Sequence, residues 1–348
     1  MKQLSCFVAG LVLISGLAAP AVRAEPIAGS GSYTIKHGGL TRTFRVHLPP
    51  GYDASVAAPL VLIFHGWGGD ENEFLGDRTV TSLADQRGYI LVAPRGLGSG
   101  APDNRNNSWS FSGSATGVGG DGRVVCDDSL TPDYSYPSCN NPDRPVAGNT
   151  CSWTQCQADD VDFVIELVAL LESDLNIDAQ NIFATGGSNG GMFTWELGQN
   201  PASAPGFRAI ASLIGLPHRG YLGPPGKQDA QGNIADLPVL VITGMLDDVV
   251  PPGEWEDASF TTTSNESDRF YYTGATAITQ SWAAAHHCEI SVPAIPFNDG
   301  FAETDCRSYC SKDPGWPRVL DCRANMGHTY SLLWAWPLIM DFFAAHFH

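Results

Sequence analysis

Basic side chains are scarce in this sequence. There are 19 lysines and arginines against 37 aspartates and glutamates, and the net charge is −18 at pH 7. A surface with so few positive groups repels polyanions, because phosphates are bound largely through lysine and arginine. We therefore expect no nucleic-acid partner and no attraction to anionic membranes. The charge names no substrate, and an acidic, solvated surface suits an extracellular setting.

Long apolar runs are also missing, with one exception near the amino end. Residues 6–19 are mainly apolar, Lys2 precedes them, and Val22 and Ala24 place small residues at a cleavage site, which is typical of a secretory signal peptide. A membrane anchor is the rival interpretation, but the run is shorter than the ~20 apolar residues that a spanning helix needs. We predict a signal peptide over residues 1–24 and one catalytic domain over 25–348. The domain is expected to be secreted, extracellular or periplasmic, without stable membrane association.

No C-x-x-C pair of the kind common in zinc sites is present. Of the nine cysteines, Cys6 lies in the predicted signal peptide, so an even number remains. An even count in an exported chain is typical of disulfides, whereas a zinc site would need matching histidines that the spacing does not supply. The cysteines form two clusters along the chain, and we expect each to be cross-linked within itself: Cys126, Cys139, Cys151 and Cys156, then Cys288, Cys306, Cys310 and Cys322.

Strand and helix patterns alternate along most of the chain. Polar and apolar residues alternate over 33–36 and 41–48 around a Gly-Gly turn, which predicts an antiparallel hairpin at a sheet edge. Continuous apolar runs predict strands buried on both faces; they cover residues 59–64, 89–93, 182–184, 209–213, 238–242 and 318–320. Helix-period stretches cover 78–87, 160–173, 191–199, 274–286 and 332–346. This order predicts an α/β fold, with a mostly parallel central sheet and helices on both faces.

The stretch from about residue 97 to 157 breaks this alternation. It is rich in Gly, Asn, Asp, Ser and Pro, and it contains the first cysteine cluster. So long a loop without periodicity indicates either a functional lid or a disordered linker, and the cysteines argue against disorder. We expect a disulfide-rich insertion beside the active site, with a surface decoration far from it as the alternative.

Residues 186–190 carry the pattern G-x-S-x-G around Ser188. A predicted strand precedes it and a predicted helix follows, which is the context of a nucleophile elbow. Glycine at 186 and 190 removes the side chains that would collide with the neighbouring strand and helix in so tight a turn. The pattern alone occurs by chance in a glycine-rich chain, but in this context it predicts Ser188 as a nucleophile.

A serine nucleophile needs a base, and the base needs an acid that holds it in one tautomer. Hydrolases with this elbow carry nucleophile, acid and base in that order along the chain. Asp247 and its neighbour Asp248 follow the predicted strand 238–242 and both remain candidates for the acid. Order and position among the nine histidines leave His328, between the strand 318–320 and the last helix, as the predicted base.

An oxyanion hole needs two N–H donors. The backbone of Asn189, directly after the nucleophile, is one candidate, and that of Trp67 in the glycine-rich segment 65–69 is the other. This segment lacks the lysine of a phosphate-binding loop, and we expect His65 to brace it. Four tryptophans could add aromatic surface near the cleft, namely Trp67, Trp109, Trp153 and Trp282, although tryptophans more often belong to the core. Of these, Trp67 and Trp282 are our candidates for substrate binding. We expect no metal and no cofactor.

Four motifs in this order resemble one group of secreted esterases, the polyhydroxybutyrate depolymerases and feruloyl esterases. They are His65-Gly66-Trp67-Gly68-Gly69, residues 186–192, residues 244–251 and Gly327-His328. The resemblance covers most of the chain outside 97–157. It implies an α/β-hydrolase fold and cofactor-free ester hydrolysis outside the cell. It also favours Asp247 as the acid, because Val-Val-Pro then follows at the spacing of the family.

Trp67 stands where the depolymerase branch usually carries a cysteine, so the chain is more similar to the feruloyl esterases. We therefore expect a monomeric secreted serine esterase that cleaves small-molecule or polymeric esters, with feruloyl or other aromatic esters preferred. A polyhydroxybutyrate depolymerase is the alternative. A serine peptidase of this fold would be expected to carry a large gating domain, and a non-catalytic binding protein would usually lack a triad member.

Overall fold

The computed structural model describes residues 26–98, 106–131, 151–156, 158–228, 232, 235–257, 262–263, 269–288, 295–310, 315–330 and 332–348. The signal peptide expected over residues 1–24 lies outside these ranges, and so does Cys139. The signal peptide and the cross-linking of Cys139 therefore stay predictions. Among the described residues, no helix is both long enough and apolar enough to cross a membrane.

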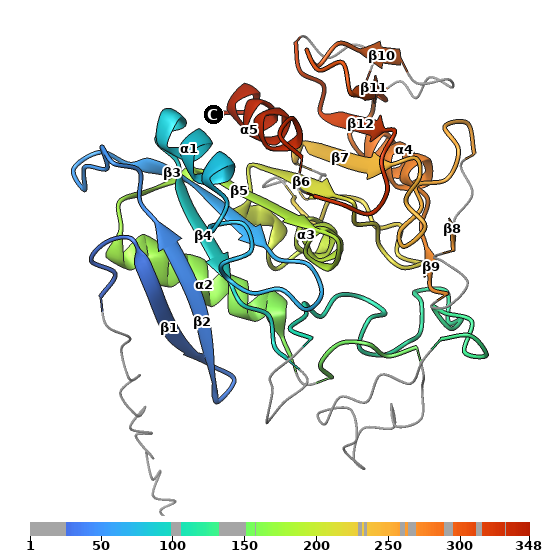
Figure 1. Cartoon of the computed structure of the whole chain (residues 1–348), viewed down its shortest axis with the longest axis horizontal. Helices are drawn as coiled ribbons and strands as arrows, with labels where there is room; N and C mark the ends of the chain where they lie inside the picture. The colour runs from blue at the N-terminus through green and yellow to red at the C-terminus, as the bar shows by residue number, and fades with distance from the viewer. Residues whose placement is uncertain are drawn as a thin grey trace, which may run out of the picture.

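A ten-stranded sheet runs through the molecule in the order β1-β2-β4-β3-β5-β6-β7-β12-β11-β10 (Figure 1). From β4 to β12 the neighbours are parallel, and the strands at both edges are antiparallel. In chain order the strands are β1 Gly31–His37, β2 Leu40–His47, β3 Ala58–Phe64, β4 Ile90–Pro94, β5 Ile177–Gly187, β6 Ala209–Leu213, β7 Val239–Gly244, β10 Ile295–Phe297, β11 Thr304–Ser308 and β12 Val319–Ala324. A separate pair joins β8 Thr262–Thr263 to β9 Tyr271–Tyr272.

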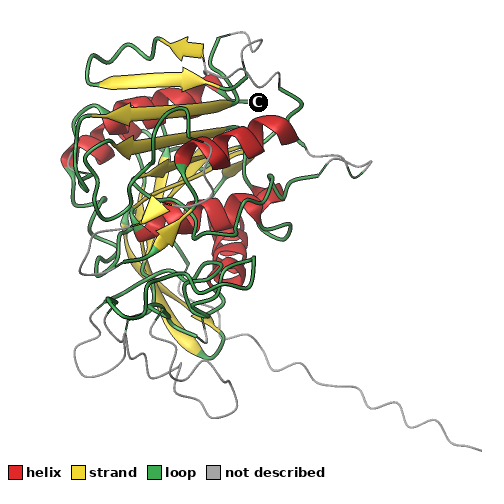
Figure 2. Ribbon diagram, turned by 90° about the vertical axis from the view of Figure 1, so that its right-hand side faces the viewer, coloured by secondary structure: helices red, strands yellow, loops and turns green. Residues whose placement is uncertain are grey.

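Helices cover both faces of this sheet (Figures 1 and 2). They are α1 Arg78–Arg87, α2 Asp160–Asp174, α3 Asn189–Gln199, the short 3₁₀ helix η2 Ala204–Gly206, α4 Ala275–Ala285 and α5 Ala335–Ala345. Successive side chains of a strand point to opposite faces. Leu60 and Leu62 of β3 accordingly pack in one apolar core with α2, α3 and α4, while Val61 and Ile63 pack in a second core with α1 and α5. This is why β3 and β4 are apolar without interruption.

The fold class is as predicted. The hairpin β1–β2 lies at one edge of the sheet, and the six predicted buried strands form its parallel centre. β10 and β11 were not predicted, because β10 is only three residues long and Thr304–Ser308 is mainly polar. These two strands extend the sheet beyond β12 through antiparallel pairing.

Three disulfides join described cysteines. They are Cys126–Cys151, Cys288–Cys310 and Cys306–Cys322, with Cα–Cα distances of 5.5, 4.9 and 4.0 Å. Each lies within one of the two predicted clusters, and Cys156 is also disulfide-bonded. The expectation of disulfides rather than a zinc site is confirmed for these residues.

The described part of the insertion is anchored in the core beside the carboxyl end of β3. The Trp109 ring is fully buried against Phe64 and Phe193, with ring centroids 5.1 and 5.2 Å away. Its indole Nε1–H donates to the carbonyl of His65 at 3.1 Å. The next residue, Ser110, donates its backbone N–H to the buried Asp160 at the start of α2. This part of the insertion therefore packs beside the elbow rather than decorating a distant surface.

Candidate active site

Ser188 occupies the turn between β5 and α3. Its backbone angles are φ 52° and ψ −118°, a region that residues with a side chain rarely adopt. Its N–H donates to the carbonyl of Leu213 at 2.9 Å, which fixes the turn against β6. A Cβ at Gly186 would lie 2.7 Å from the Phe64 oxygen, and a Cβ at Gly190 only 2.1 Å from it. Both positions therefore require glycine for steric reasons.

The structure brings Ser188, His328 and Asp247 into one hydrogen-bonded chain. His328 follows β12, and its Nε2 lies 2.8 Å from the Ser188 Oγ. Its Nδ1 lies 2.8 Å from the Asp247 Oδ2. This network assigns the neutral tautomer in which Nδ1–H donates to the carboxylate and the serine hydroxyl donates to Nε2. That is the arrangement in which a histidine can take a serine proton.

Burial and hydrogen bonding distinguish Asp247 from its neighbour. The Asp247 side chain is fully buried, and its second oxygen, Oδ1, accepts from the backbone N–H groups of Val249 and Val250 at 2.9 and 2.8 Å. Asp248 is exposed to solvent. The geometry therefore places Asp247, and not Asp248, in position to orient His328.

Two cavities meet at Ser188, and both are also lined by Trp67 and Val249. The first, called here the apolar cavity, has a volume of about 130 Å³. Its further lining is Asn189, Met192, Val250, Trp153, Phe270 and Tyr272. The second, called here the His328 cavity, has a volume of about 360 Å³ and is also lined by His328, Thr329 and Tyr330.

The two predicted oxyanion donors, Asn189 and Trp67, line the apolar cavity together with Ser188. Asn189 is the first residue of α3, so its backbone N–H has no acceptor within the helix. Its buried side chain accepts from the N–H of Trp109 at 2.7 Å and donates to the carbonyl of Trp109 at 3.1 Å. These two hydrogen bonds to the insertion fix the start of α3. Trp67 is 40% exposed and lines both cavities.

His65 braces the glycine-rich segment, as expected. Its ring is buried, with Nδ1–H donating to the Gly66 carbonyl at 2.7 Å and Nε2 accepting from the Gly96 N–H at 2.9 Å. Burial lowers the pKa of His65 to about 4, so the ring is neutral at neutral pH. A neutral ring with both nitrogens engaged holds the segment but takes no part in proton transfer.

Glu73 links the glycine-rich segment to the loop that carries His328. One carboxylate oxygen accepts from the Gly66 N–H at 2.8 Å, and the other accepts from the hydroxyl of Tyr330. Burial is the larger cause that raises the pKa of Tyr330, and the hydrogen bond to Glu73 raises it further. The phenol therefore stays a donor. Glu73 and Tyr330 were not predicted, because 257 positions separate them and no local pattern connects them.

Trp282, expected at the substrate cleft, lies instead in the core. It is fully buried on α4, with its ring edge-on to Trp195 at 5.3 Å. Its indole N–H donates to the carbonyl of Gly223 at 3.1 Å. The expectation was wrong because the helix turns this position towards α3 and the sheet, away from Ser188.

Trp153 of the insertion, also considered as aromatic surface near the cleft, does reach the site. It lines the apolar cavity, and its indole Nε1–H donates to the Nε2 of His218 at 2.9 Å. The His218 ring is buried and stacked on Phe111 and Tyr272, and its Nδ1–H donates to the carbonyl of Tyr271. Burial lowers the pKa of His218 to about 4.

Both buried histidines are expected to make the fold sensitive to acid. Their pKa values are about 4 in the folded chain and about 6.5 when unfolded. The unfolded chain binds a proton at each histidine more readily than the folded chain does. The contribution of each histidine to the free energy of unfolding is therefore complete above pH 6.5 and is lost as the pH falls through 4. The loss is on the order of 3 kcal/mol for each histidine.

The free energy of unfolding, measured by urea denaturation between pH 7 and pH 4, tests this expectation. His218→Gln provides the control, since an amide can accept from Trp153 and donate to Tyr271 but does not titrate. Its stability should depend less steeply on pH over this window. An equally steep dependence in both proteins would contradict the assignment.

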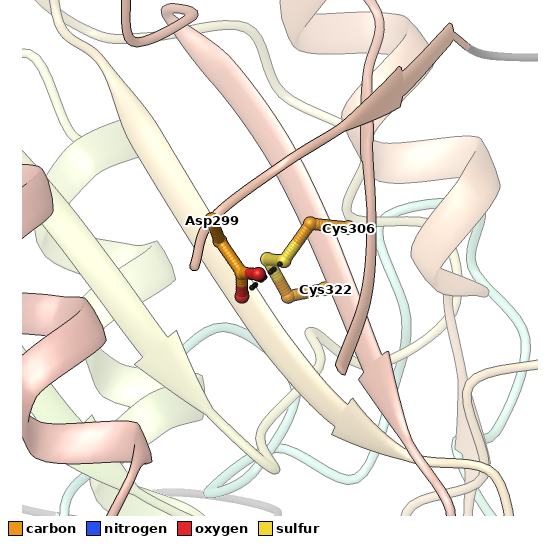
Figure 3. A group of neighbouring side chains, drawn as sticks. All are labelled: Asp299, Cys306 and Cys322. Carbon is orange, nitrogen blue, oxygen red and sulfur yellow. Dashed lines mark hydrogen bonds between the residues drawn. A yellow bond between two sulfur atoms is a disulfide. The ribbon is translucent and has the colours of Figure 1, made fainter. Parts of the chain in front are cut away.

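Two groups of described side chains lie close enough together to be considered as metal ligands. Figure 3 shows the first, in which Asp299 points towards Cys306 and Cys322. Those cysteines form a disulfide, so neither supplies the thiolate that binds a metal. The second consists of His37 with two exposed carboxylates, and His37 already bonds to Glu166 at 2.9 Å. Neither group supports a metal site.

Comparison with known proteins gives a limited match in sequence and a broad one in structure. No protein-family model matches the chain. The protein "Putative esterase NocK" of Nocardia uniformis subsp. tsuyamanensis is 30% identical over 216 residues, which are 61% of this chain. The chain spans about half the length of this relative, 47%.

The acetyl xylan esterase from Aspergillus awamori is a solved structure that resembles the chain over nearly its whole length. The match covers 90% of this chain and 99% of that protein, with a TM-score of 0.54 and 14% identity. At this identity the likeness concerns the fold, and it agrees with the sheet order and the strand-turn-helix at Ser188. The chain has the α/β-hydrolase fold.

Proposed function

We propose that this chain is a secreted serine esterase, with one catalytic domain, that hydrolyses carboxylic esters through an acyl-enzyme. The observation that carries the proposal is the hydrogen-bonded chain from Asp247 through His328 to Ser188, placed at a strained turn where two cavities meet. A buried carboxylate, a histidine and a serine in this geometry form the arrangement that activates a serine for acyl transfer. The relative that matches the chain also carries the name of an esterase.

The reaction follows from the positions of these groups. The Ser188 Oγ attacks the ester carbonyl as Nε2 of His328 takes its proton, and Asp247 stabilises the imidazolium. The N–H groups of Asn189 and Trp67 hold the oxyanion. His328 then donates its proton to the departing alcohol, and water activated by the same nitrogen releases the acid. These steps require no cofactor and no metal.

We favour an aromatic or polymer-linked ester, such as a feruloyl ester, as the substrate. The aromatic lining of the apolar cavity and the position of Trp67 support this preference over polyhydroxybutyrate. Disulfides are typical of oxidising compartments, which supports secretion of the chain, and we propose a monomer. We propose that the chain does not bind nucleic acid, and its net negative charge supports this proposal.

Labelling with a fluorophosphonate tests the proposed chemistry. The reagent is expected to modify the native protein and to leave Ser188→Ala unmodified, because it reacts with an activated serine. Equal labelling of both proteins, or no labelling of the native one, would refute the assignment.

Parallel hydrolysis of methyl ferulate, a short p-nitrophenyl ester and a polyhydroxybutyrate film tests the substrate. We expect cleavage of the first two. Clearing of the film without hydrolysis of methyl ferulate would overturn the preference for aromatic esters and favour the depolymerase.

A further inference from the structure

The two cavities at Ser188 differ in which of the proposed catalytic residues lines them. Asn189 lines the apolar cavity, and His328 lines the His328 cavity. Ser188, Trp67 and Val249 line both. An ester bound at Ser188 therefore has two distinct spaces for its two halves.

The proposed mechanism assigns one half to each space. The leaving oxygen must come within hydrogen-bond reach of Nε2 of His328 to receive its proton, so the alcohol half lies in the His328 cavity. The carbonyl oxygen must at the same time face the N–H of Asn189. The acyl half then extends into the apolar cavity, which Asn189 lines and His328 does not.

The apolar cavity sets a limit on the size and chemistry of the acyl half. Its volume of about 130 Å³ is slightly below the roughly 150 Å³ of a cavity known to hold one benzene molecule. Among the residues that the structure describes, none with a charged side chain lines it, and Met192, two valines and four aromatic rings supply most of the wall. Such a space suits one aromatic ring or a short alkyl chain and disfavours a charged or long acyl group.

Trp153 is the part of this wall that the insertion supplies. It is only 7% exposed, and its ring packs against Phe111 and Phe270 with centroids 5.7 and 5.8 Å away. Its indole Nε1 is held by the hydrogen bond to Nε2 of His218, with 2.9 Å between the two nitrogens. Two residues before it, Cys151 is tied by a disulfide to Cys126. These contacts hold the ring in place, so the wall resists displacement by a larger acyl group.

We infer that the substrate carries an apolar acyl group whose outer part, about the size of one aromatic ring, fills the apolar cavity, and that Trp153 determines the largest acyl group accepted. The inference rests on the proposed function, since it uses the roles of His328 and Asn189 in ester hydrolysis. Trp153 has no part in proton transfer here, and it acts on specificity alone.

A series of p-nitrophenyl esters, from acetate to decanoate with benzoate added, tests the inference. The unmodified enzyme is expected to hydrolyse benzoate and the short alkanoates, with kcat/KM falling steeply beyond about eight carbons. In Trp153→Ala the ratio of kcat/KM for decanoate to that for acetate should rise at least about tenfold. Trp153→Phe should give an intermediate ratio, and it protects the test against poor folding of the alanine variant.

The control is Trp316→Ala, which removes a tryptophan that packs on Phe297 and Phe342 and lines neither cavity. Its chain-length profile should match that of the unmodified enzyme. Fluorophosphonate labelling of each variant counts the active sites and normalises the rates.

The possible outcomes separate the inference from the proposed function. If both Trp153 variants label normally but keep the original chain-length profile, the inference is wrong while the esterase assignment stands. If the unmodified protein neither labels nor hydrolyses any ester, the proposed function itself fails. A steep preference for decanoate in the unmodified enzyme would also overturn the size limit.

Discussion

Asp247→Asn is expected to lower kcat about 10⁴-fold while leaving the fold intact. The Oδ1 atom of Asp247 accepts from the N–H groups of Val249 and Val250, and an asparagine must keep its carbonyl oxygen there. Its NH₂ group then faces Nδ1 of His328, which has to accept rather than donate. The ring proton moves to Nε2, and that nitrogen no longer accepts the proton of Ser188.

The neighbouring residue provides a matched control. Asp248→Asn removes the same charge one position along, from an exposed side chain, and should change kcat by less than about threefold. The kcat for p-nitrophenyl acetate and the rate of fluorophosphonate labelling measure both effects. If Asp248→Asn loses activity and Asp247→Asn keeps it, the assignment of the acid is reversed.

Replacing Arg323 is expected to cause a large loss in the free energy of unfolding. Arg323 and Asp321 of β12 are both fully buried, and the guanidinium NH2 lies 2.8 Å from the carboxylate. The same guanidinium donates to the Gly253 carbonyl and to Thr276, and it stacks over the Trp255 ring at 3.8 Å. It thus joins the central sheet to α4 and to the segment that follows Asp247.

Arg323→Met leaves the Asp321 carboxyl buried without its cation. Burial already raises the pKa of Asp321 even with the arginine present, so the isolated group is costly to keep in the core. We expect the free energy of unfolding to fall by about 3–5 kcal/mol.

Urea denaturation measures this loss, and the double variant Asp321→Leu/Arg323→Met is the control. Replacing both partners by apolar side chains removes the unpaired carboxyl and should recover a large part of the stability. A single variant that loses less than about 1 kcal/mol would contradict the role of the pair.

Local sequence patterns were sufficient for the central architecture and for the tight turn at Ser188. The apolar runs of β3, β4 and β7 have no polar interruption because both faces of these strands are buried, so they are visible without the structure. Ser188 is visible because its turn excludes a side chain at Gly186 and Gly190. In both cases a short-range steric or burial requirement acts on adjacent residues.

Patterns that depend on the partner of a residue were not sufficient. Helical spacing put Trp282 in a predicted helix but could not show that its side chain meets Trp195 rather than the substrate. Asp247 and Asp248 are adjacent and chemically identical, and only the packing of the loop buries one beside His328 and exposes the other. Glu73 and Tyr330 meet only after the chain has folded.

By itself, the sequence determined the α/β architecture, the strand-turn-helix at Ser188 and the regions in which Asp247 and His328 lie, because each leaves a periodic or steric pattern in neighbouring residues. Tertiary structure alone decided which aspartate orients His328, that Trp153 and not Trp282 reaches the cavity, and how Glu73 joins the two loops. Those choices depend on contacts between segments far apart in the chain, and the irregular insertion that supplies Trp153 has no periodicity from which its contacts could be read.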